Sequence, residues 1–265
     1  MEMRAQFLRE LAKSGLPSGP RAADPVTETE LEALPEPARR YLRFMGTVGR
    51  MRDWSFRGGV EGFFRMTPHK RFNYCEAWLY DNRVALSRVF HMRLRFHHVV
   101  PATGRDTYRR GKGRMVIRLL DLYTIADGKG AEFDATELVA YLNDAVLMAP
   151  SMLLVPEVTW TAVDGSAFGL SITDHDRSVS ARVMVDRRGA PLEFSTMDRF
   201  CSDPDDPEKV LRVRWTTPVA GWELVDGRQV FTRVEARWHL PAGIFTYADF
   251  RPIPGTFAYN VAPGG

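Results

Sequence analysis

One stretch of eight residues alternates strictly between apolar side chains and cationic or imidazole side chains. The apolar positions are Phe90, Met92, Leu94 and Phe96. The positions between them are His91, Arg93, Arg95 and His97. Because successive side chains of a β-strand point to opposite faces of the sheet, the pattern predicts a strand that covers an apolar interior with one face and presents positive charge with the other.

The same period of two recurs, less regularly, from Trp54 to Trp238, and short turn sequences such as Asp164-Gly165 separate the runs. Many strands at short spacing indicate an antiparallel meander rather than a parallel α/β sheet. One helix interrupts the strands near residues 134–149, where Asp134 and Glu137 have the spacing of a capping box. We expect a mainly β (α+β) fold: a strongly curved antiparallel sheet or half-barrel with this helix on its concave side.

Helical spacing also marks the start of the chain. Met3, Phe7 and Leu11 fall on one helix face, and Thr27 with Glu30 has the spacing of a second capping box. The sequence therefore predicts two parts. Residues 1–50 form an N-terminal helical cap and linker, and residues 51–265 form the antiparallel β domain with its inserted helix.

Charge is distributed unevenly although the net charge is only +3. The segment 83–118 is rich in arginine, and the segment 121–144 that follows is rich in carboxylates. One interpretation is a solvated basic face balanced by an acidic neighbour. The other interpretation is an anion site formed by Arg93, Arg95, Arg105 and Arg109. Guanidinium groups favour such a site because their planar donors match planar anions. The mild net charge does not indicate nucleic-acid binding.

Signatures of redox, metal and cofactor chemistry do not stand out in the sequence. Cys75 and Cys201 are far apart, and the histidines lack the spacing of a zinc site. We expect no metal and no cofactor. The first residues do not have the composition of a secretory signal, and no run of eighteen apolar residues occurs, so we expect a cytoplasmic protein.

Aromatic and methionine side chains are the clearest candidates for a binding function. Large apolar side chains on the strands fill a core by default. A curved sheet with a helix on it can also leave a cavity for an apolar ligand, which methionines would line adaptably. The candidate lining residues are Trp78, Tyr80, Phe90, Met92, Phe96, Met115, Tyr141, Met148, Trp160, Trp215 and Trp238.

Three motifs resemble an uncharacterised bacterial family whose members are often membrane-anchored. Residues 34–42 match L-P-x-x-x-x-R-Y-L, residues 137–142 match E-L-x-x-Y-L, and residues 238–247 match W-x-L-P-x-G-x-F-x-Y. The family supplies no catalytic residues. By fold analogy, its plan is similar to that of the half-barrel carriers of lipids and lipoproteins.

Three functions remain open. The leading hypothesis is a non-catalytic carrier or sensor of an apolar small molecule, with or without an anionic group, such as a lipid or fatty acid, with the arginine group holding an acidic head. An enzyme would need a polar cleft, for which the candidate residues are His91, Asp127, Tyr141, His175 and His239. An interaction module would bring the basic stripe, including Arg109 and Arg110, to an anionic membrane or an acidic partner.

Overall fold

The computed structural model describes residues 3–20, 24–96, 100–204, 206 and 209–264, without the side chains of Phe96 and Val100. The chain begins with three helices, α1 (Met3–Ala12), α2 (Glu28–Leu31) and α3 (Glu36–Phe44). The predicted capping box at the start of α2 is confirmed, since the Thr27 hydroxyl and the Glu30 carboxylate each accept from the other's backbone N–H. The helical parts predicted before residue 50 are therefore present.

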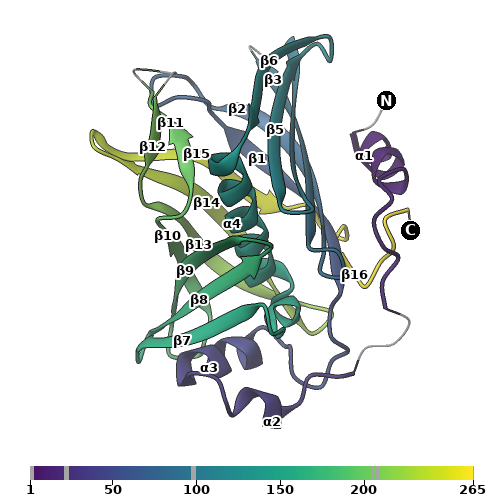
Figure 1. The fold of residues 1–265 in the computed structure, drawn as a ribbon, viewed down its shortest axis with the longest axis vertical. Helices are drawn as coiled ribbons and strands as arrows, with labels where there is room; N and C mark the ends of the chain where they lie inside the picture. The colour runs from purple at the N-terminus through teal and green to yellow at the C-terminus, as the bar shows by residue number, and fades with distance from the viewer. Residues whose placement is uncertain (1–2, 21–23, 97–99, 205, 207–208, 265) are drawn as a thin grey trace.

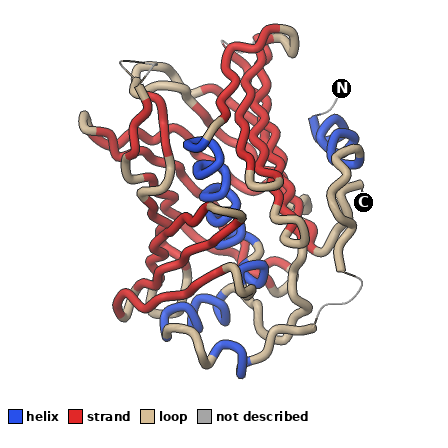
Figure 2. The backbone as a smooth tube through the Cα atoms, viewed as in Figure 1, coloured by secondary structure: helices blue, strands red, loops and turns tan. Residues whose placement is uncertain are grey.

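Strands follow from residue 55 and form a 14-stranded antiparallel sheet (Figures 1 and 2). Its order is β6-β5-β4-β3-β2-β1-β15-β14-β13-β10-β9-β8-β7, and β16 pairs with β1. The first half comprises β1 (Ser55–Phe64), β2 (Asn73–Asn82), β3 (Ser87–Phe96), β4 (Val100–Arg109), β5 (Lys112–Leu119) and β6 (Tyr123–Lys129).

The second half of the sheet joins the first half through the antiparallel pairing of β15 with β1. It comprises β7 (Val158–Asp164), β8 (Ala167–Asp174), β9 (Arg177–Val185), β10 (Pro191–Thr196), β13 (Trp215–Val225), β14 (Arg228–Leu240), β15 (Gly243–Pro252) and β16 (Ala258–Tyr259). A separate two-stranded sheet is formed by β11 (Phe200–Ser202) and β12 (Val210–Arg212).

The helix α4 (Ala131–Met148) runs through the concave side of the sheet and leads into the short 3-10 helix η1 (Pro150–Leu153) (Figure 1). Every residue of α4 from Asp134 to Met148 is buried. A helix that is apolar on most sides is typical of such a central position. The predicted fold class, a curved antiparallel sheet with a helix on its concave side, is confirmed.

The start of α4 differs from the prediction. The N-cap is Gly130, and no side chain caps the helix, so the predicted capping box of Asp134 and Glu137 is wrong. The helix begins three residues earlier, which leaves Asp134 inside it. Its carboxylate accepts from the Gly113 N–H over 2.8 Å and lies 3.4 Å from the Arg177 guanidinium. Asp134 thereby joins β5 and β9, which belong to opposite halves of the sheet.

Glycines let α4 approach the sheet closely at this point. A Cβ on Gly113 would lie 2.1 Å from the Phe133 carbonyl oxygen, and a Cβ on Gly128 would lie 2.1 Å from the Phe133 ring. Neither distance is possible for real atoms. Gly113 and Gly128 therefore create the space in which the first turn of α4 packs.

Two helices cover opposite faces of the same strands. On the inner face, Cys75, Ala77 and Leu79 of β2 belong to the main core around α4. On the outer face, Trp78 and Tyr80 form a second apolar cluster with Met3, Phe7 and Leu11 of α1. The alternation of side chains along β2 therefore assigns successive residues to the two helices.

Candidate functional site

Three charged side chains meet between α4 and β3 inside the half-barrel. Arg88 donates from Nη1 to Glu137 Oε2 over 2.9 Å and from Nε to Asp144 Oδ2 over 2.7 Å. Arg88, Glu137 and Asp144 are only 6%, 1% and 8% exposed. Glu137 and Asp144 of the acidic segment therefore do not balance a solvated basic face, because they pair in the interior with Arg88 of the basic segment.

The helix repeat explains this arrangement. Glu137 and Asp144 are seven residues apart, which is close to two helical turns, so they lie on one side of α4 at an axial separation of about 10 Å. Arg88 lies near the start of β3 and projects to the inner face. Its guanidinium has several donors in a planar fork, which allows one side chain to bind both carboxylates.

Two more carboxyl groups extend this arrangement on neighbouring strands. Asp81 of β2 lies directly opposite Arg88, and Asp106 of β4 lies opposite Phe90, so both share the inner face. Asp81 is completely buried, and among the described residues neither of its carboxyl oxygens has a hydrogen-bond partner. The group Asp81, Arg88, Asp106, Glu137 and Asp144 is called the inner charged cluster below.

Burial changes the protonation of the inner charged cluster. It raises the pKa of Glu137 to about 8, and repulsion from Asp106 adds to this although Arg88 opposes it. Burial likewise raises the pKa of Asp106, and it raises the pKa of Asp81 well above the usual range with help from Asp144. Glu137 and Asp81 therefore retain protons more readily near neutral pH than ordinary carboxyl groups do, and a protonated carboxyl group can donate a hydrogen bond.

Arg199 lies beside the inner charged cluster on a surface of aromatic rings. Its guanidinium carbon is 4.1 Å from the ring centre of Trp215 and 5.7 Å from that of Trp238. Trp238 stacks on Tyr247 at 6.1 Å, and Trp215 Nε1 donates to the Tyr247 hydroxyl over 3.0 Å. We call Trp215, Trp238 and Tyr247 the aromatic platform. Within the described part of the chain, the buried Nε of Arg199 has no hydrogen-bond partner.

The charge of Arg199 acts on the inner charged cluster. It favours the ionised forms of Asp106 and Glu137 and so partly opposes the rise in their pKa that burial causes. Arg199 is half-buried. A guanidinium over aromatic rings, beside carboxyl groups of raised pKa, has the charge and the planar donors that suit a carboxylate or a phosphate.

Most of the predicted lining residues surround α4. Met92, Tyr141, Met148, Trp215 and Trp238 belong to the main core, and Phe90 and Trp160 pack against it. The β-sheet register places Met115 on the same inner face, in line with Phe90. These residues do not form one site, because Trp160 packs with Tyr41 and Phe168 near α3, apart from the aromatic platform.

Trp78 and Tyr80 lie elsewhere. Both are on the outer face of β2 under α1, so they do not join the lining residues around α4. Phe7 of α1 lies over Trp78, with the two ring centres 6.4 Å apart. The side chain of Phe96 lies outside the described residues.

The predicted anion-binding arginines also lie on the outer face. Arg105 donates to Glu10 of α1 over 2.7 Å, and Arg109 donates to the Ser14 carbonyl over 2.6 Å. Arg93 and Arg95 alternate with the inner-face residues of β3 and share this outer side. A ligand on the concave side therefore cannot reach these four arginines. They lie on the side that carries α1.

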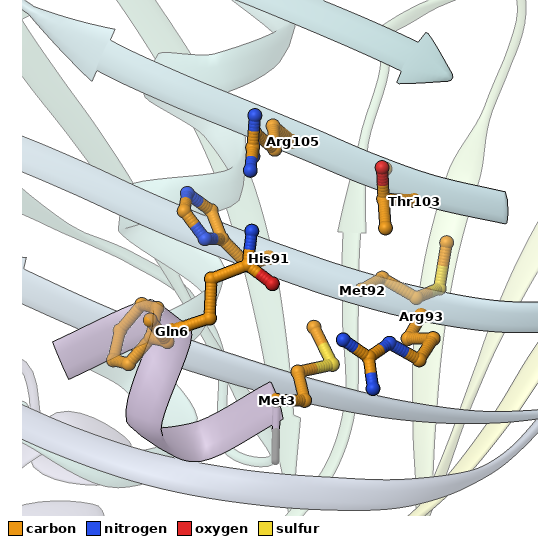
Figure 3. Close-up of a pocket in the computed structure, with 9 residues that line it drawn as sticks. Met3, Gln6, His91, Met92, Arg93, Thr103 and Arg105 are labelled. Carbon is orange, nitrogen blue, oxygen red and sulfur yellow. The ribbon is translucent and has the colours of Figure 1, made fainter. Parts of the chain in front are cut away.

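A small pocket lies between α1 and the outer face (Figure 3). Met3 and Gln6 of α1 lie over His91, Arg93 and Arg105. Its volume of about 10 Å³ is the room that one water molecule needs, roughly 10–15 Å³. Burial lowers the pKa of His91 to about 4, with the Glu10 charge opposing and the Arg105 charge adding to the effect. The imidazole is therefore neutral under α1 at neutral pH.

The candidate residues of an enzyme are dispersed over the fold. His91 is under α1, Asp127 pairs with Arg114 over 2.8 Å, and Tyr141 lies in the core. His175 lies 3.1 Å from its neighbour Asp174 in the turn between β8 and β9, and His239 contacts Thr216 over 3.1 Å. Among the residues that the structure describes, no group of three or more His, Cys, Asp or Glu side chains could hold a metal ion.

The inner charged cluster is absent from the site predicted by sequence, although two signals point to it. Glu137 and Asp144 are charged residues two turns apart in an otherwise apolar helical stretch. Asp106 is an isolated carboxylate within the arginine-rich segment. Arg199 has no comparable signal, because it lies in the short connection between β10 and β11 and meets the cluster only in the folded chain.

Fold and site together define an antiparallel half-barrel around a buried helix, with charged groups enclosed between helix and sheet. The chain belongs to a family of unknown function, DUF6544, whose model matches residues 24–250. The predicted resemblance to an uncharacterised family is confirmed at this level. No curated protein and no solved structure matches the chain. Among the described helices, none has both the length and the apolar character needed to cross a bilayer.

Proposed function

We propose that the protein is a carrier or sensor that binds an amphipathic small molecule with an acidic group, such as a fatty acid, on the concave side. The observation that carries this proposal is Arg199, a half-buried guanidinium on the aromatic platform beside carboxyl groups of raised pKa. Arg199 would bind the acidic group. Apolar side chains of the inner face would contact the rest of the ligand.

Protonated carboxyl groups make this arrangement selective for an anion. Near neutral pH, Glu137 holds its proton because burial raises its pKa to about 8. A protonated carboxyl group donates a hydrogen bond to an acidic ligand instead of repelling it, as a protonated aspartate does in some oxyanion sites. Arg199 and Glu137 would then act together on one anionic group.

The test is ligand binding by protein purified without detergent. Native mass spectrometry should detect a co-purified acidic lipid, and palmitate should raise the melting temperature. A ligand present at one hundred times its dissociation constant stabilises the folded protein by about 2.7 kcal/mol. Arg199→Gln should abolish the palmitate shift.

The matched control is Arg214→Gln. Arg214 is also an arginine near a strand end, but it is exposed and pairs with Glu193 over 2.7 Å. The palmitate shift should survive this substitution. An empty wild-type protein whose melting temperature is indifferent to palmitate and to phospholipids would refute the proposal.

A second candidate function is general acid–base catalysis on a bound small molecule. It is favoured by Glu137, because a carboxyl group with a pKa near the working pH can exchange protons in both directions. Prolonged incubation of the protein with its co-purified molecule separates the two functions. An unchanged molecule supports the carrier, whereas a product that Glu137→Gln fails to form supports the enzyme.

A further inference from the structure

The turn between β5 and β6 lies at one end of the molecule (Figure 1), and apolar side chains of this turn and of the start of β6 are exposed to solvent. Leu120, Leu122, Tyr123 and Ile125 are 47%, 76%, 66% and 50% exposed. Four exposed apolar residues within six positions differ from the scattered single residues that are normal on a protein surface. Contiguous exposure of this kind marks an interaction site.

The backbone of this turn is held in an unfavourable conformation. Leu120 and Asp121 have φ values of 55° and 57°, and Leu122 N donates to the Leu119 carbonyl over 3.1 Å. Turns in which two successive residues have positive φ favour Asn and Gly at these positions, because side chains such as leucine resist positive φ. Asp121 helps to fix the turn by accepting from Thr103 Oγ1 over 2.7 Å. Backbone strain that is retained in an exposed turn is typical of functional segments.

Two arginines lie next to this apolar turn. Arg95 of β3 pairs with Pro101 of β4, whose carbonyl accepts from Leu120 N over 2.9 Å. Arg118 of β5 pairs with Thr103 on the same outer face. Arg95 is exposed, and within the described chain the Nε of Arg118 is buried without a hydrogen-bond partner.

We propose that the β5–β6 tip docks on an anionic lipid bilayer. The tip is defined as Leu120, Leu122, Tyr123 and Ile125 together with Arg95 and Arg118. Its apolar side chains would enter the boundary between headgroups and acyl chains, while the two guanidinium groups contact lipid phosphates. Tyrosine is suited to this boundary because its ring is apolar and its hydroxyl is polar. Charge complementarity selects an anionic bilayer over a neutral one.

Vesicle flotation tests this proposal. Wild-type protein should float with vesicles of phosphatidylcholine and phosphatidylglycerol, and much less with vesicles of phosphatidylcholine alone. Leu122→Ser combined with Tyr123→Ser should reduce the partition coefficient about tenfold or more, since the apolar area that enters the bilayer is lost. Arg95→Gln and Arg118→Gln should each reduce it about fivefold, and high salt should mimic their effect.

The matched control is Leu224→Ser combined with Val225→Ser at the end of β13. These residues are 69% and 46% exposed, so they test the loss of exposed apolar surface at another place. This variant should float like the wild type, and all variants should keep the wild-type melting temperature. Equal binding of the tip variant and the wild type, or no preference for phosphatidylglycerol, would overturn the proposal. Palmitate binding is measured without vesicles, so the two proposals can fail separately.

Discussion

The two faces of strands β2–β4 each carry charged side chains under a helix, but the two environments differ in burial. On the inner face, Arg88 binds Glu137 and Asp144 of α4, and these side chains are 12% exposed or less. On the outer face, Arg105 binds Glu10 of α1 with the two side chains 27% and 38% exposed. The same strand alternation therefore produces arginine–carboxylate pairs of very different burial on the two faces.

Burial determines how much each ion pair contributes to the free energy of unfolding. An exposed pair contributes about 0–1 kcal/mol, because water screens the charges. The desolvation of a buried ion pair can cost more free energy than the attraction between its charges returns, so a buried pair is weak evidence of a role in stability. We interpret the outer pairs as attachments of α1 and the inner charged cluster as part of a binding site.

The largest predicted effect comes from Arg88→Ala. The variant leaves Glu137 and Asp144 without their buried partner and should lose about 3–5 kcal/mol of unfolding free energy in urea. A triple variant, Arg88→Met with Glu137→Leu and Asp144→Leu, should recover most of the stability, because it removes every buried charge of the trio. A mild effect of Arg88→Ala alone would show that this interior is open to water.

Phe7→Ala tests the packing of α1 on the outer face of the sheet. Phe7 is completely buried against Trp78 and His91, and its truncation should cost about 3 kcal/mol, because the cavity left behind adds to the loss of buried apolar surface. The effect should be local. Hydrogen exchange should show faster exchange in α1 while amides of α4 keep their protection. Equal acceleration in both helices would contradict the separation of the two faces.

The pH dependence of stability should have opposite signs on the two faces. The pKa of Glu137 is raised from 4.5 to about 8 in the folded protein, so its contribution to stability is complete below about 4.5 and is lost as the pH rises through 8. The pKa of His91 is lowered from 6.5 to about 4, so its contribution is complete above 6.5 and is lost as the pH falls through 4.

Urea unfolding across this pH range separates the two groups. One titrating proton changes stability by at most about 1.4 kcal/mol per pH unit. Glu137→Gln should flatten the alkaline decline, and His91→Phe should flatten the acidic decline. If neither substitution changed the dependence of the unfolding free energy on pH, groups other than Glu137 and His91 would be responsible for it.

The smallest predicted effect is that of Arg105→Gln. This variant removes the exposed pair with Glu10 and should cost about 0–1 kcal/mol in urea unfolding. A loss of unfolding free energy as large as that of Arg88→Ala would show that the Arg105–Glu10 pair is shielded from water as well as the inner charged cluster is. It would contradict the difference between the two faces.

The fold was predictable because local patterns determine it. The period of two in β3 and the helical spacing between residues 134 and 149 are strong signals, and both elements occur where they are expected. The start of α4 was not predictable from the capping pattern, since the Asp134 carboxylate binds Gly113 of β5 instead of capping the helix. Such a contact depends on tertiary packing.

The candidate site was predictable only in part. Alternation separates the two faces of a strand but does not say which face an aromatic residue takes, so Trp78 and Trp215 look equivalent in sequence and lie on opposite sides of the sheet. Arg93 and Arg105 lie on the face of the sheet opposite to Met92. Arg199 approaches Trp215 only through the folding of β10 and β11 around α4, which no local pattern encodes.

The most direct test of the proposed binding site is a pH titration of the Glu137 side-chain carboxyl carbon by NMR, with and without palmitate. We expect a midpoint near 8 in the free protein and a higher midpoint with palmitate, because a second anion beside Glu137 favours its protonated form. A midpoint near 4.5 that palmitate leaves unchanged would contradict the proposed binding site.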